Sequence, residues 1–305
     1  MSTIVGANIV RVQARRRGSR TYYYLVHSYR DGRKVRKLEQ YLGHKLPVDI
    51  EARKANLRLD LLTQQWNPVL SRVREQYRLN RRKMPESVRE KELDTFATRF
   101  TYDSNRIEGS SLTLRETALL LADGVTPSNR PLADVLEALA HQRVFLNALQ
   151  QDSRLDRDAL LRWHDELFRE TKPLIAGKIR EFRVGISGSA YAPPLPVELD
   201  HLLTEFFAWL RVAWRTMHPV VLAALVHLRL VSIHPFGDGN GRVTRLAMNF
   251  VLHKKGYPML DIPYSQRSGY YRALERTHLT GDEGVFVRWF LRRYLEENSW
   301  TLKEN

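Results

Sequence analysis

Apolar residues recur at intervals of three and four along most of the chain, which is the period of an amphipathic helix. From about Val48 to Leu79 this spacing is followed by Leu57, Leu61, Leu62, Trp66, Val69, Leu70, Val73 and Tyr77. Further helical patterns lie around residues 93–106, 113–121, 132–149, 157–169, 199–214, 220–233, 242–254, 268–277 and 285–296. Pro85 predicts a break between the first pattern and the rest. We therefore expect a mainly α-helical protein.

Two segments lack the helical period. Thr21 to Gly43 is rich in tyrosine and β-branched residues and predicts two strands joined at Asp31-Gly32, because Asp-Gly favours the positive φ angles of a tight hairpin turn. Residues 177–194, GKIREFRVGISGSAYAPP, predict a short β-hairpin that forms an exposed flap. We expect three parts: a basic β-hairpin unit at 1–47, a helical linker at 48–92 and a helical core at 93–305.

The charge of the chain is concentrated near its N-terminus. Residues 1–45 hold eleven lysine and arginine residues against Asp31 and Glu39, a balance of +9 within the whole chain's +15. The chain has no cysteine, which excludes disulfides, thiolate metal sites and a cysteine nucleophile. The first residues lack the apolar stretch of a signal peptide, and no apolar run is long enough to span a bilayer. We expect a soluble, cytoplasmic protein.

The stretch IHPFGDGNGRVTRL, residues 233–246, gathers reactive groups in a short break between two helical patterns. Its glycines allow several backbone N–H groups to converge at the start of the second helix, where they favour an anion. Arg242 and Arg245 lie on the first turn of that helix and suit a polyphosphate, and Asp238 suits a Mg²⁺ that bridges carboxylate and phosphate. His234, beside the same loop, is placed to accept a proton.

Two familiar phosphate motifs do not fit this stretch. The chain has no G-x-x-x-x-G-K-[ST] sequence, and GDGNG follows a helix, whereas the dinucleotide fingerprint follows a strand. The alternative is an ordinary helix-loop-helix connection with solvated arginines. A turn does not require a histidine, an aspartate, an asparagine and two arginines within twelve residues, so we favour a functional site.

The segment HPFGDGNGRVTR, residues 234–245, resembles the signature HPFx[DE]GNGRxxR of the Fic family at every specified position. Three other segments resemble family elements in the expected order. SNRIEG at 104–109 is similar to the inhibitory pattern [ST]xxxE[GN], residues 177–194 to the target-binding flap, and QRSGYYRAL at 266–274 to the segment that borders the nucleotide base. The resemblance covers about residues 93–296 and implies a Fic-type helical bundle.

The resemblance implies protein adenylyl transfer, in which AMP moves from ATP to a Ser, Thr or Tyr hydroxyl of a target protein and pyrophosphate is released. His234 would be the general base and Asp238 the Mg²⁺ ligand. Asn240, Arg242 and Arg245 would act on the phosphates, together with the backbone of Gly237, Gly239 and Gly241. The target would pair with the flap at 177–194.

Glu108 and Ser104 belong to the inhibitory segment. In the family pattern the equivalent glutamate pairs with the second arginine of the signature, here Arg245, and prevents productive docking of the γ-phosphate. Glu108 could alternatively orient a water that removes AMP from a modified target, as in some relatives, and a helix-end capping role is the structural alternative.

Tyr270 and Tyr271 lie where relatives border the adenine, and His278 lies where an asparagine is often found, so we expect these three residues at the nucleotide. Core packing is the alternative for one of the tyrosines. We interpret His227, seven residues before His234, as structural because no third metal ligand accompanies it.

Two other functions fit parts of the sequence. The basic, tyrosine-rich N-terminal unit could bind nucleic acid, or dock on an acidic partner protein. Some Fic relatives transfer phosphate or phosphocholine, although the intact GNGRxxR favours AMP. Fic proteins commonly dimerise, so the resemblance also implies a homodimer.

Overall fold

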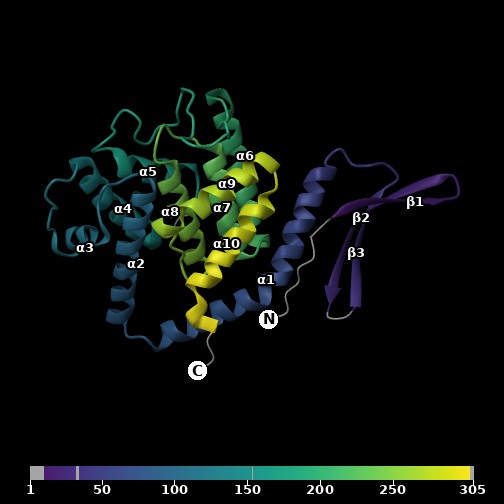
Figure 1. The fold of residues 1–305 in the computed structure, drawn as a ribbon, viewed down its shortest axis with the longest axis horizontal. Helices are drawn as coiled ribbons and strands as arrows, with labels where there is room; N and C mark the ends of the chain where they lie inside the picture. Colours follow the sequence, from purple (N-terminus) through teal and green to yellow (C-terminus); the bar gives the residue numbers. More distant parts are fainter. Residues whose placement is uncertain (1–9, 32–33, 153, 303–305) are drawn as a thin grey trace. The chain divides into compact units, whose positions relative to one another are not determined.

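The computed structural model describes residues 10–31, 34–152 and 154–302, and the side chains of all of these except 29–31 and 34 (Figure 1). The chain divides into two compact units, residues 1–66 and 67–305. The helix α1, Ile50–Lys83, contributes to both units. The domain boundaries expected at 47 and 92 stay a prediction.

The N-terminal unit is built on a three-stranded antiparallel sheet in the order β1-β2-β3. Its strands are β1 (Arg11–Arg17), β2 (Arg20–Asp31) and β3 (Lys34–Gly43). The two predicted strands are confirmed, while the predicted Asp31-Gly32 turn includes residues outside the described part of the chain. β1 was not predicted, because RVQARRR carries almost no apolar alternation. Val10 and Leu25 bury their side chains against Leu57 of α1.

The second unit is helical and contains all the predicted helices. Besides the end of α1 it holds α2 (Glu86–Ile107), α3 (Leu114–Asp123), α4 (Leu132–Gln150), α5 (Arg157–Phe168), α6 (Pro196–Thr216), α7 (Pro219–Ile233), α8 (Asn240–Lys254), α9 (Arg267–Thr280) and α10 (Glu283–Glu297). Short 3-10 helices lie at Tyr264–Gln266 and Ser299–Leu302. The mainly helical fold is confirmed. Among the described helices none is long and apolar enough to cross a membrane.

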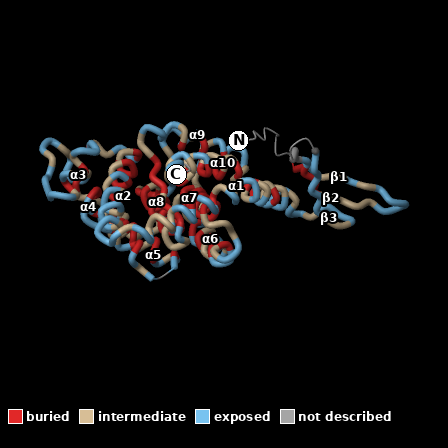
Figure 2. The backbone as a smooth tube through the Cα atoms, turned by 90° about the horizontal axis from the view of Figure 1, so that it is seen from below, coloured by how far each residue is buried: buried red, intermediate tan, exposed pale blue. Residues whose placement is uncertain are grey.

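Helix α7 is the centre of the helical unit. All its residues are buried except Pro219, Arg229 and Ser232, as expected for a helix that is apolar on every side (Figure 2). It packs against α6, α8 and α10. Because α7 is enclosed, the short loop that joins it to α8 starts from a fixed position.

The segment 177–194 differs from the prediction of a β-hairpin. It contains turns and extended backbone but no paired strand. Pro193 and Pro194 have no N–H group to donate to a ladder. The backbone is held by a side chain instead: the buried Arg180 donates to the carbonyl oxygens of Phe182 (2.9 Å) and Pro194 (2.6 Å).

Candidate active site

The loop between α7 and α8 is shaped by its own residues. His234 ends α7 in the left-handed region, with φ 52° and ψ 57°, and Gly239 precedes α8 with φ 77°. A Cβ atom on Gly239 would lie 2.2 Å from the Phe168 ring, so only glycine fits there. Gly237 is similarly confined, because a Cβ atom would lie 2.9 Å from the Phe182 ring. The glycines therefore let the loop pass between aromatic side chains of α5 and the flap.

The Asn240 carboxamide closes this loop. Its Oδ1 accepts from the Phe236 N–H at 2.9 Å, and its Nδ2 donates to the Phe236 carbonyl at 2.8 Å. The residue is buried and both ends of the amide are satisfied. We had expected the Asn240 side chain to face the α-phosphate, but in this structure it holds the loop. Its backbone N–H remains at the start of α8.

The first turn of α8 offers free backbone donors. The first main-chain bond of the helix runs from the Val243 N–H to the Gly239 carbonyl at 3.1 Å. The N–H groups of residues 240–242 therefore have no partner within the helix. The Gly239 N–H, which we had expected at the phosphate, instead donates to the Asp238 carboxylate at 2.5 Å.

His234 is held in the state that a general base needs. Its Nδ1 lies 3.2 Å from the Val231 carbonyl oxygen, which can only accept, so Nδ1 carries the proton and Nε2 is the basic nitrogen. Burial lowers the pKa of His234 below its ordinary value of 6.5, and the positive charge of Arg180 adds to this effect. The imidazole is therefore neutral at pH 7.

Arg245 is buried and clamped by the inhibitory segment. Its Nε donates to the Ser104 hydroxyl at 3.0 Å, and its Nη2 donates to the Ser104 carbonyl at 2.9 Å and to the Glu108 carboxylate at 2.7 Å. Burial alone would lower the pKa of Arg245, but the Glu108 charge raises it. The guanidinium thus stays charged; its Nε and Nη2 atoms are engaged by the end of α2, whereas Nη1 is buried without a hydrogen-bond partner.

The Glu108 carboxylate also covers the start of α8. A Cβ atom on Gly241 would lie 2.1 Å from Glu108 Oε1. Because glycine has no side chain, the Glu108 carboxylate can occupy this space. An anionic group thus rests against Arg245 and the first turn of α8, where unpaired N–H groups and the helix dipole favour negative charge.

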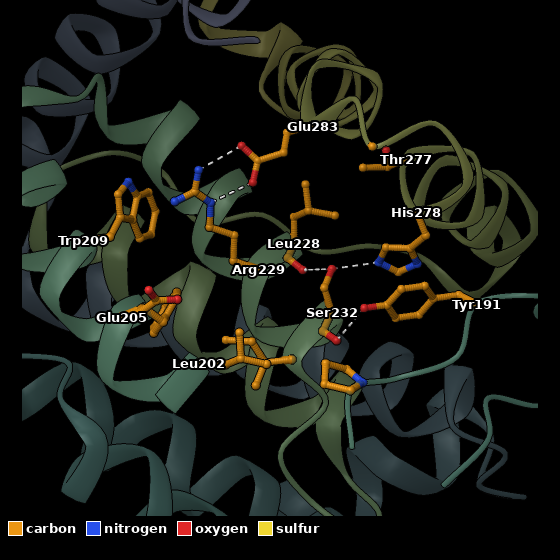
Figure 3. A pocket seen from close by; sticks show the side chains of 14 residues that line it. Tyr191, Leu202, Glu205, Trp209, Leu228, Arg229, Ser232, Thr277, His278 and Glu283 are labelled. Atoms are coloured by element: carbon orange, nitrogen blue, oxygen red, sulfur yellow. Dashed lines mark hydrogen bonds and ion pairs between the residues drawn. The ribbon is translucent and has the colours of Figure 1, made fainter. Parts of the chain in front are cut away.

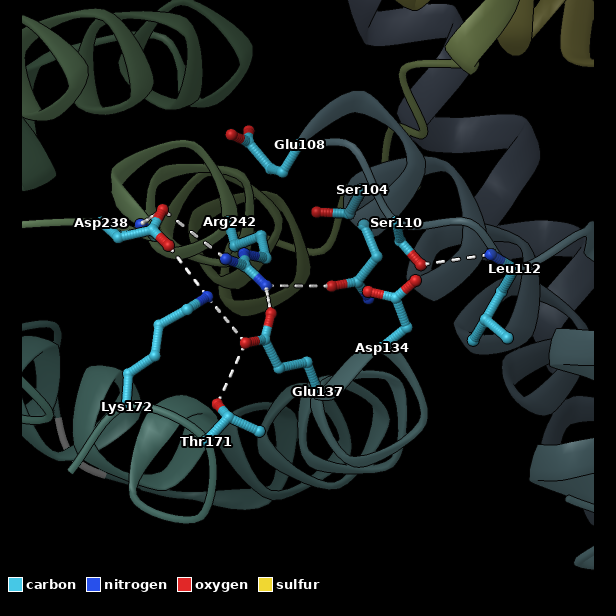
Figure 4. A network of polar contacts seen from close by, with 12 residues as sticks. Ser104, Glu108, Ser110, Leu112, Asp134, Glu137, Thr171, Lys172, Asp238 and Arg242 are labelled. Atoms are coloured by element: carbon cyan, nitrogen blue, oxygen red, sulfur yellow. Dashed lines mark hydrogen bonds and ion pairs between the residues drawn. The ribbon is translucent and has the colours of Figure 1, made fainter. Parts of the chain in front are cut away.

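Arg242 belongs to a second polar network, drawn in Figure 4. It is buried, forms an ion pair with Glu137 of α4 and stacks 4.4 Å above the Phe168 ring. Lys172 lies 2.7 Å from Glu137 and 2.9 Å from Asp238. Both arginines were expected to act on the phosphates, and Arg245 also to pair with Glu108; in this structure each has a carboxylate partner within the chain.

Glu137, Lys172 and Arg180 were missed by the sequence analysis. Glu137 left a signal, since it is an acidic residue among the apolar positions of VLEALA. Lys172 and Arg180 stand in loops without a period, so nothing in the sequence separated them from solvated basic residues.

Asp238 is able to hold a divalent cation together with a ligand. Burial alone would raise its pKa, but the Lys172 hydrogen bond and the Arg242 charge outweigh burial and lower it, so the carboxylate is ionised. In the described residues no three His, Cys, Asp or Glu side chains gather as a metal cage. One carboxylate fits Mg²⁺, which commonly takes one or two carboxylates plus substrate phosphates.

A cavity of about 430 Å³ opens beside His234. Its walls come from the end of α2, the flap tip, α7, α8 and α9, and they include Glu108, Ile186, Ser187, Gly188, Ser189, His234, Gly241, Tyr271 and His278. This volume suits a small ligand. His234, the start of α8 where an anion was expected to bind, Glu108 and the tip of the flap therefore line the same cavity.

The three residues expected at the nucleotide base lie in different settings. Tyr270 is 1% exposed and its hydroxyl lies 3.0 Å from His227, so it is the core tyrosine of the pair. Tyr271 is 44% exposed and its hydroxyl donates to the Ile107 carbonyl, at the mouth of the cavity. His278 stacks on Tyr191 with centroids 3.8 Å apart, and its Nε2 lies 2.7 Å from the Ser232 hydroxyl. The His278 ring is therefore already in contact with the side chains of Tyr191 and Ser232.

A second cavity, of about 470 Å³, lies on the other side of His278 (Figure 3). It lies between α6, α7 and the α9–α10 junction, and the Arg229–Glu283 ion pair forms one wall. Tyr191 lines this second cavity, and its hydroxyl donates to the Ser232 carbonyl at 3.0 Å. Neither His234 nor Glu108 reaches this second space.

The flap and the loop are joined by two buried side chains. Arg180 Nε donates to the His234 carbonyl at 2.8 Å. His164 accepts from the Gly177 N–H at 2.9 Å, and its Nε2 lies 3.0 Å from the Asp238 carbonyl. Burial lowers the pKa of His164 to about 4, so it is a neutral donor and acceptor at pH 7. Both ends of the loop are thereby tied to the start of the flap.

Known proteins are similar to this chain in sequence and in fold. The Fic/DOC family model matches residues 154–252. Protein adenylyltransferase Fic of Drosophila erecta is 37% identical over 191 residues, which are 61% of this chain and 38% of that protein. The chain thus spans less than two fifths of the length of this curated relative.

Two solved structures are similar over most of the chain. A Fic domain containing signaling protein from Bacteroides thetaiotaomicron superposes with a TM-score of 0.69 at 27% identity, over 77% of this chain and 95% of that one. A fragment of Fic-1 from C. elegans superposes with a TM-score of 0.67 at 25% identity, over 83% and 74% of the two chains. Residues 154–252 thus match the Fic/DOC family model, and the two solved Fic structures have the same fold as this chain.

Proposed function

We propose that the chain is a protein adenylyltransferase that is inhibited by its own Glu108. One observation carries this proposal: an internal carboxylate lies against Arg245 and the start of α8, beside a neutral histidine. That carboxylate marks the place where an external phosphate would bind. The relatives named as protein adenylyltransferases support AMP as the group that is transferred.

The proposed reaction uses ATP and a hydroxyl of a target protein. The hydroxyl oxygen attacks the α-phosphorus of ATP, the bond from that phosphorus to the oxygen bridging to the β-phosphate breaks, and pyrophosphate leaves. The hydroxyl proton passes to Nε2 of His234. The N–H groups of residues 240–242 face the anion at the start of α8 and stabilise charge that develops on the phosphate oxygens.

Arg245, Arg242 and Asp238 would orient the leaving phosphates. Arg245 binds a phosphate once Glu108 withdraws, and Arg242 adds a fixed positive charge behind the loop. Asp238 would hold Mg²⁺, which, when bound, neutralises the phosphate oxygens and fixes their position. Asn240 supports these groups by keeping the loop closed.

The flap would present the target. Residues 186–189 line the cavity opposite His234, so a segment that follows the flap places a hydroxyl near Nε2. The flap has no ladder of its own, and within the described residues the N–H groups of residues 181–188 donate to no acceptor, so they are available to an extended segment. This mode of binding depends little on target sequence.

The decisive experiment is the transfer of label from α-labelled ATP, with mass spectrometry of the modified protein. We expect an AMP adduct on protein hydroxyls in the presence of Mg²⁺. An adduct with the mass of phosphate or phosphocholine would replace the assignment by another transferase activity. Incubation of an AMP-modified protein with the unlabelled enzyme tests the reverse function, in which Glu108 would orient a water.

Lys172 is expected to strengthen nucleotide binding. Its ammonium group contacts Glu137 and Asp238; without it Glu137 would keep its Arg242 partner, but Asp238 would lose its nearest cation and repel the incoming phosphates. Lys172→Met should weaken ATP affinity by roughly tenfold, the effect of about 1.4 kcal/mol. Calorimetric titration in Mg²⁺ measures this. The matched control is Lys178→Met, because the Lys178 ammonium contacts only the Leu174 carbonyl; equal losses in both variants would contradict a specific role.

The rate of transfer should depend on pH through His234. The base must be unprotonated, and its pKa is lowered by burial, so activity should be constant above pH 6.5 and fall on acidification only below that value. A profile of kcat/KM from pH 5 to 8 checks this, with nucleotide binding followed over the same range. A profile that rises toward acid would mean that His234 acts in its protonated form.

A further inference from the structure

A third cavity lies where the end of α1, the start of α2 and the end of α8 meet. Its volume is about 320 Å³ and its walls are Arg74, Tyr77, Arg78, Arg81, Arg82, Arg89, His253, Gly256 and Tyr257. Five of these residues are arginines and none is acidic. The cavity shares no wall with the candidate active site.

The arginines of this cavity are poorly neutralised. Within the described residues only Arg78 has a carboxylate partner, the exposed Glu75 at 2.7 Å. Arg74 and Arg81 lie instead over the rings of Tyr257 and Tyr77, at 5.4 and 5.6 Å. The Nε atom of Arg89 is buried without a hydrogen-bond partner. A buried donor without a partner is costly, which suggests that an acceptor from outside belongs there.

The positive charge of these arginines also affects the pKa values of neighbouring groups. Burial lowers the pKa of His253, and the charges of Lys254 and Arg81 lower it further. Burial likewise lowers the pKa of Lys255, with Arg74 adding to the effect. The cavity therefore disfavours cations and favours anions.

We propose that this cavity binds a compact polyphosphate anion. Guanidinium groups form paired hydrogen bonds with phosphate oxygens, and several of them around one hollow suit a ligand with more than one phosphate group. The volume of about 320 Å³ suits a small molecule better than the backbone of a nucleic acid, which needs an extended surface. The site is separate from the proposed transferase site.

The test is a calorimetric titration of the chain with inorganic tripolyphosphate at fixed ionic strength. The variant Arg74→Gln/Arg81→Gln/Arg89→Gln should bind at least about tenfold more weakly, since three charge-assisted contacts are removed. The control Arg211→Gln/Arg215→Gln/Arg292→Gln loses the same net charge from exposed positions outside the cavity and should bind like the unaltered chain. Arg245→Ala removes an anion contact of the active site and should leave this binding intact.

Thermal unfolding keeps the test valid if a variant folds poorly. Tripolyphosphate should raise the Tm of the unaltered chain and of the control, but not of the Arg74/Arg81/Arg89 variant, whose own Tm should not fall because mutual repulsion is relieved. Unchanged binding in that variant, or equal losses in the control, would overturn the proposal. So would single-stranded DNA that binds through the same arginines and is not displaced by tripolyphosphate.

Discussion

Replacement of His234 by alanine is expected to abolish AMP transfer while leaving nucleotide binding intact. The imidazole lines the cavity with its Nε2 unprotonated at pH 7, and a positioned general base contributes roughly 100- to 10,000-fold to rate. Nucleotide affinity should persist because the imidazole is not among the groups at the start of α8 that would bind the phosphates. Transfer of α-labelled AMP and calorimetric nucleotide titration measure the two quantities separately.

A second variant separates chemistry from folding. His234 has a left-handed backbone, which asparagine tolerates better than alanine does. His234→Asn should therefore keep the loop and the Tm of the unaltered chain and still lose transfer. Activity in His234→Asn near that of the unaltered chain would remove His234 from the mechanism, and some other group would have to accept the proton.

Replacement of Glu108 by glycine should increase AMP transfer by roughly ten- to a hundredfold. The carboxylate holds Arg245 at 2.7 Å and fills the space over Gly241, so ATP must displace it. A hydrogen bond between charged groups contributes about 1.5–3 kcal/mol, and each 1.4 kcal/mol corresponds to a factor of ten. The initial rate of label transfer at subsaturating ATP measures the gain.

Graded variants check that the gain comes from this contact. Glu108→Gln keeps the size of the side chain but removes its charge, and should give an intermediate rate. Ser104→Ala removes one hydroxyl contact to Arg245 and leaves Glu108 in place, so it should have a smaller effect. If Glu108→Gly labels no faster than the unaltered chain, Glu108 does not inhibit, and its pairing with Arg245 is structural.

The helices and the meeting of the site residues were predictable because they rest on strong local patterns. Helix α7 is apolar apart from His227, Arg229 and Ser232, and the loop after it has a dense, ordered set of reactive residues. SNRIEG was expected to oppose Arg245 from the family resemblance, and the distance of 2.7 Å from Arg245 to Glu108 confirms the contact. The residues between the two segments gave no clue to it.

The errors have one physical origin: the sequence did not show which partner each polar group would find. Asn240 was expected at the phosphate, yet its amide is satisfied by the Phe236 backbone within its own loop. Arg242 was expected to act on the phosphates, and the sequence did not show that Glu137 would pair with it from a helix about a hundred residues earlier. The flap lacks strands because Arg180, a residue without a distinctive pattern, holds its ends.

Arg180 has a consequence for how the two substrates communicate. One guanidinium donates to the carbonyl of His234 and to two carbonyls of the flap, so it links the segment proposed to dock the target with the residue proposed to take the proton. Under that proposal, a docked polypeptide that displaces the flap would shift His234 through the Arg180 side chain. Binding of the target and the rate of AMP transfer would then change together. A target hydroxyl that is poorly positioned would react slowly even at a saturating concentration of target.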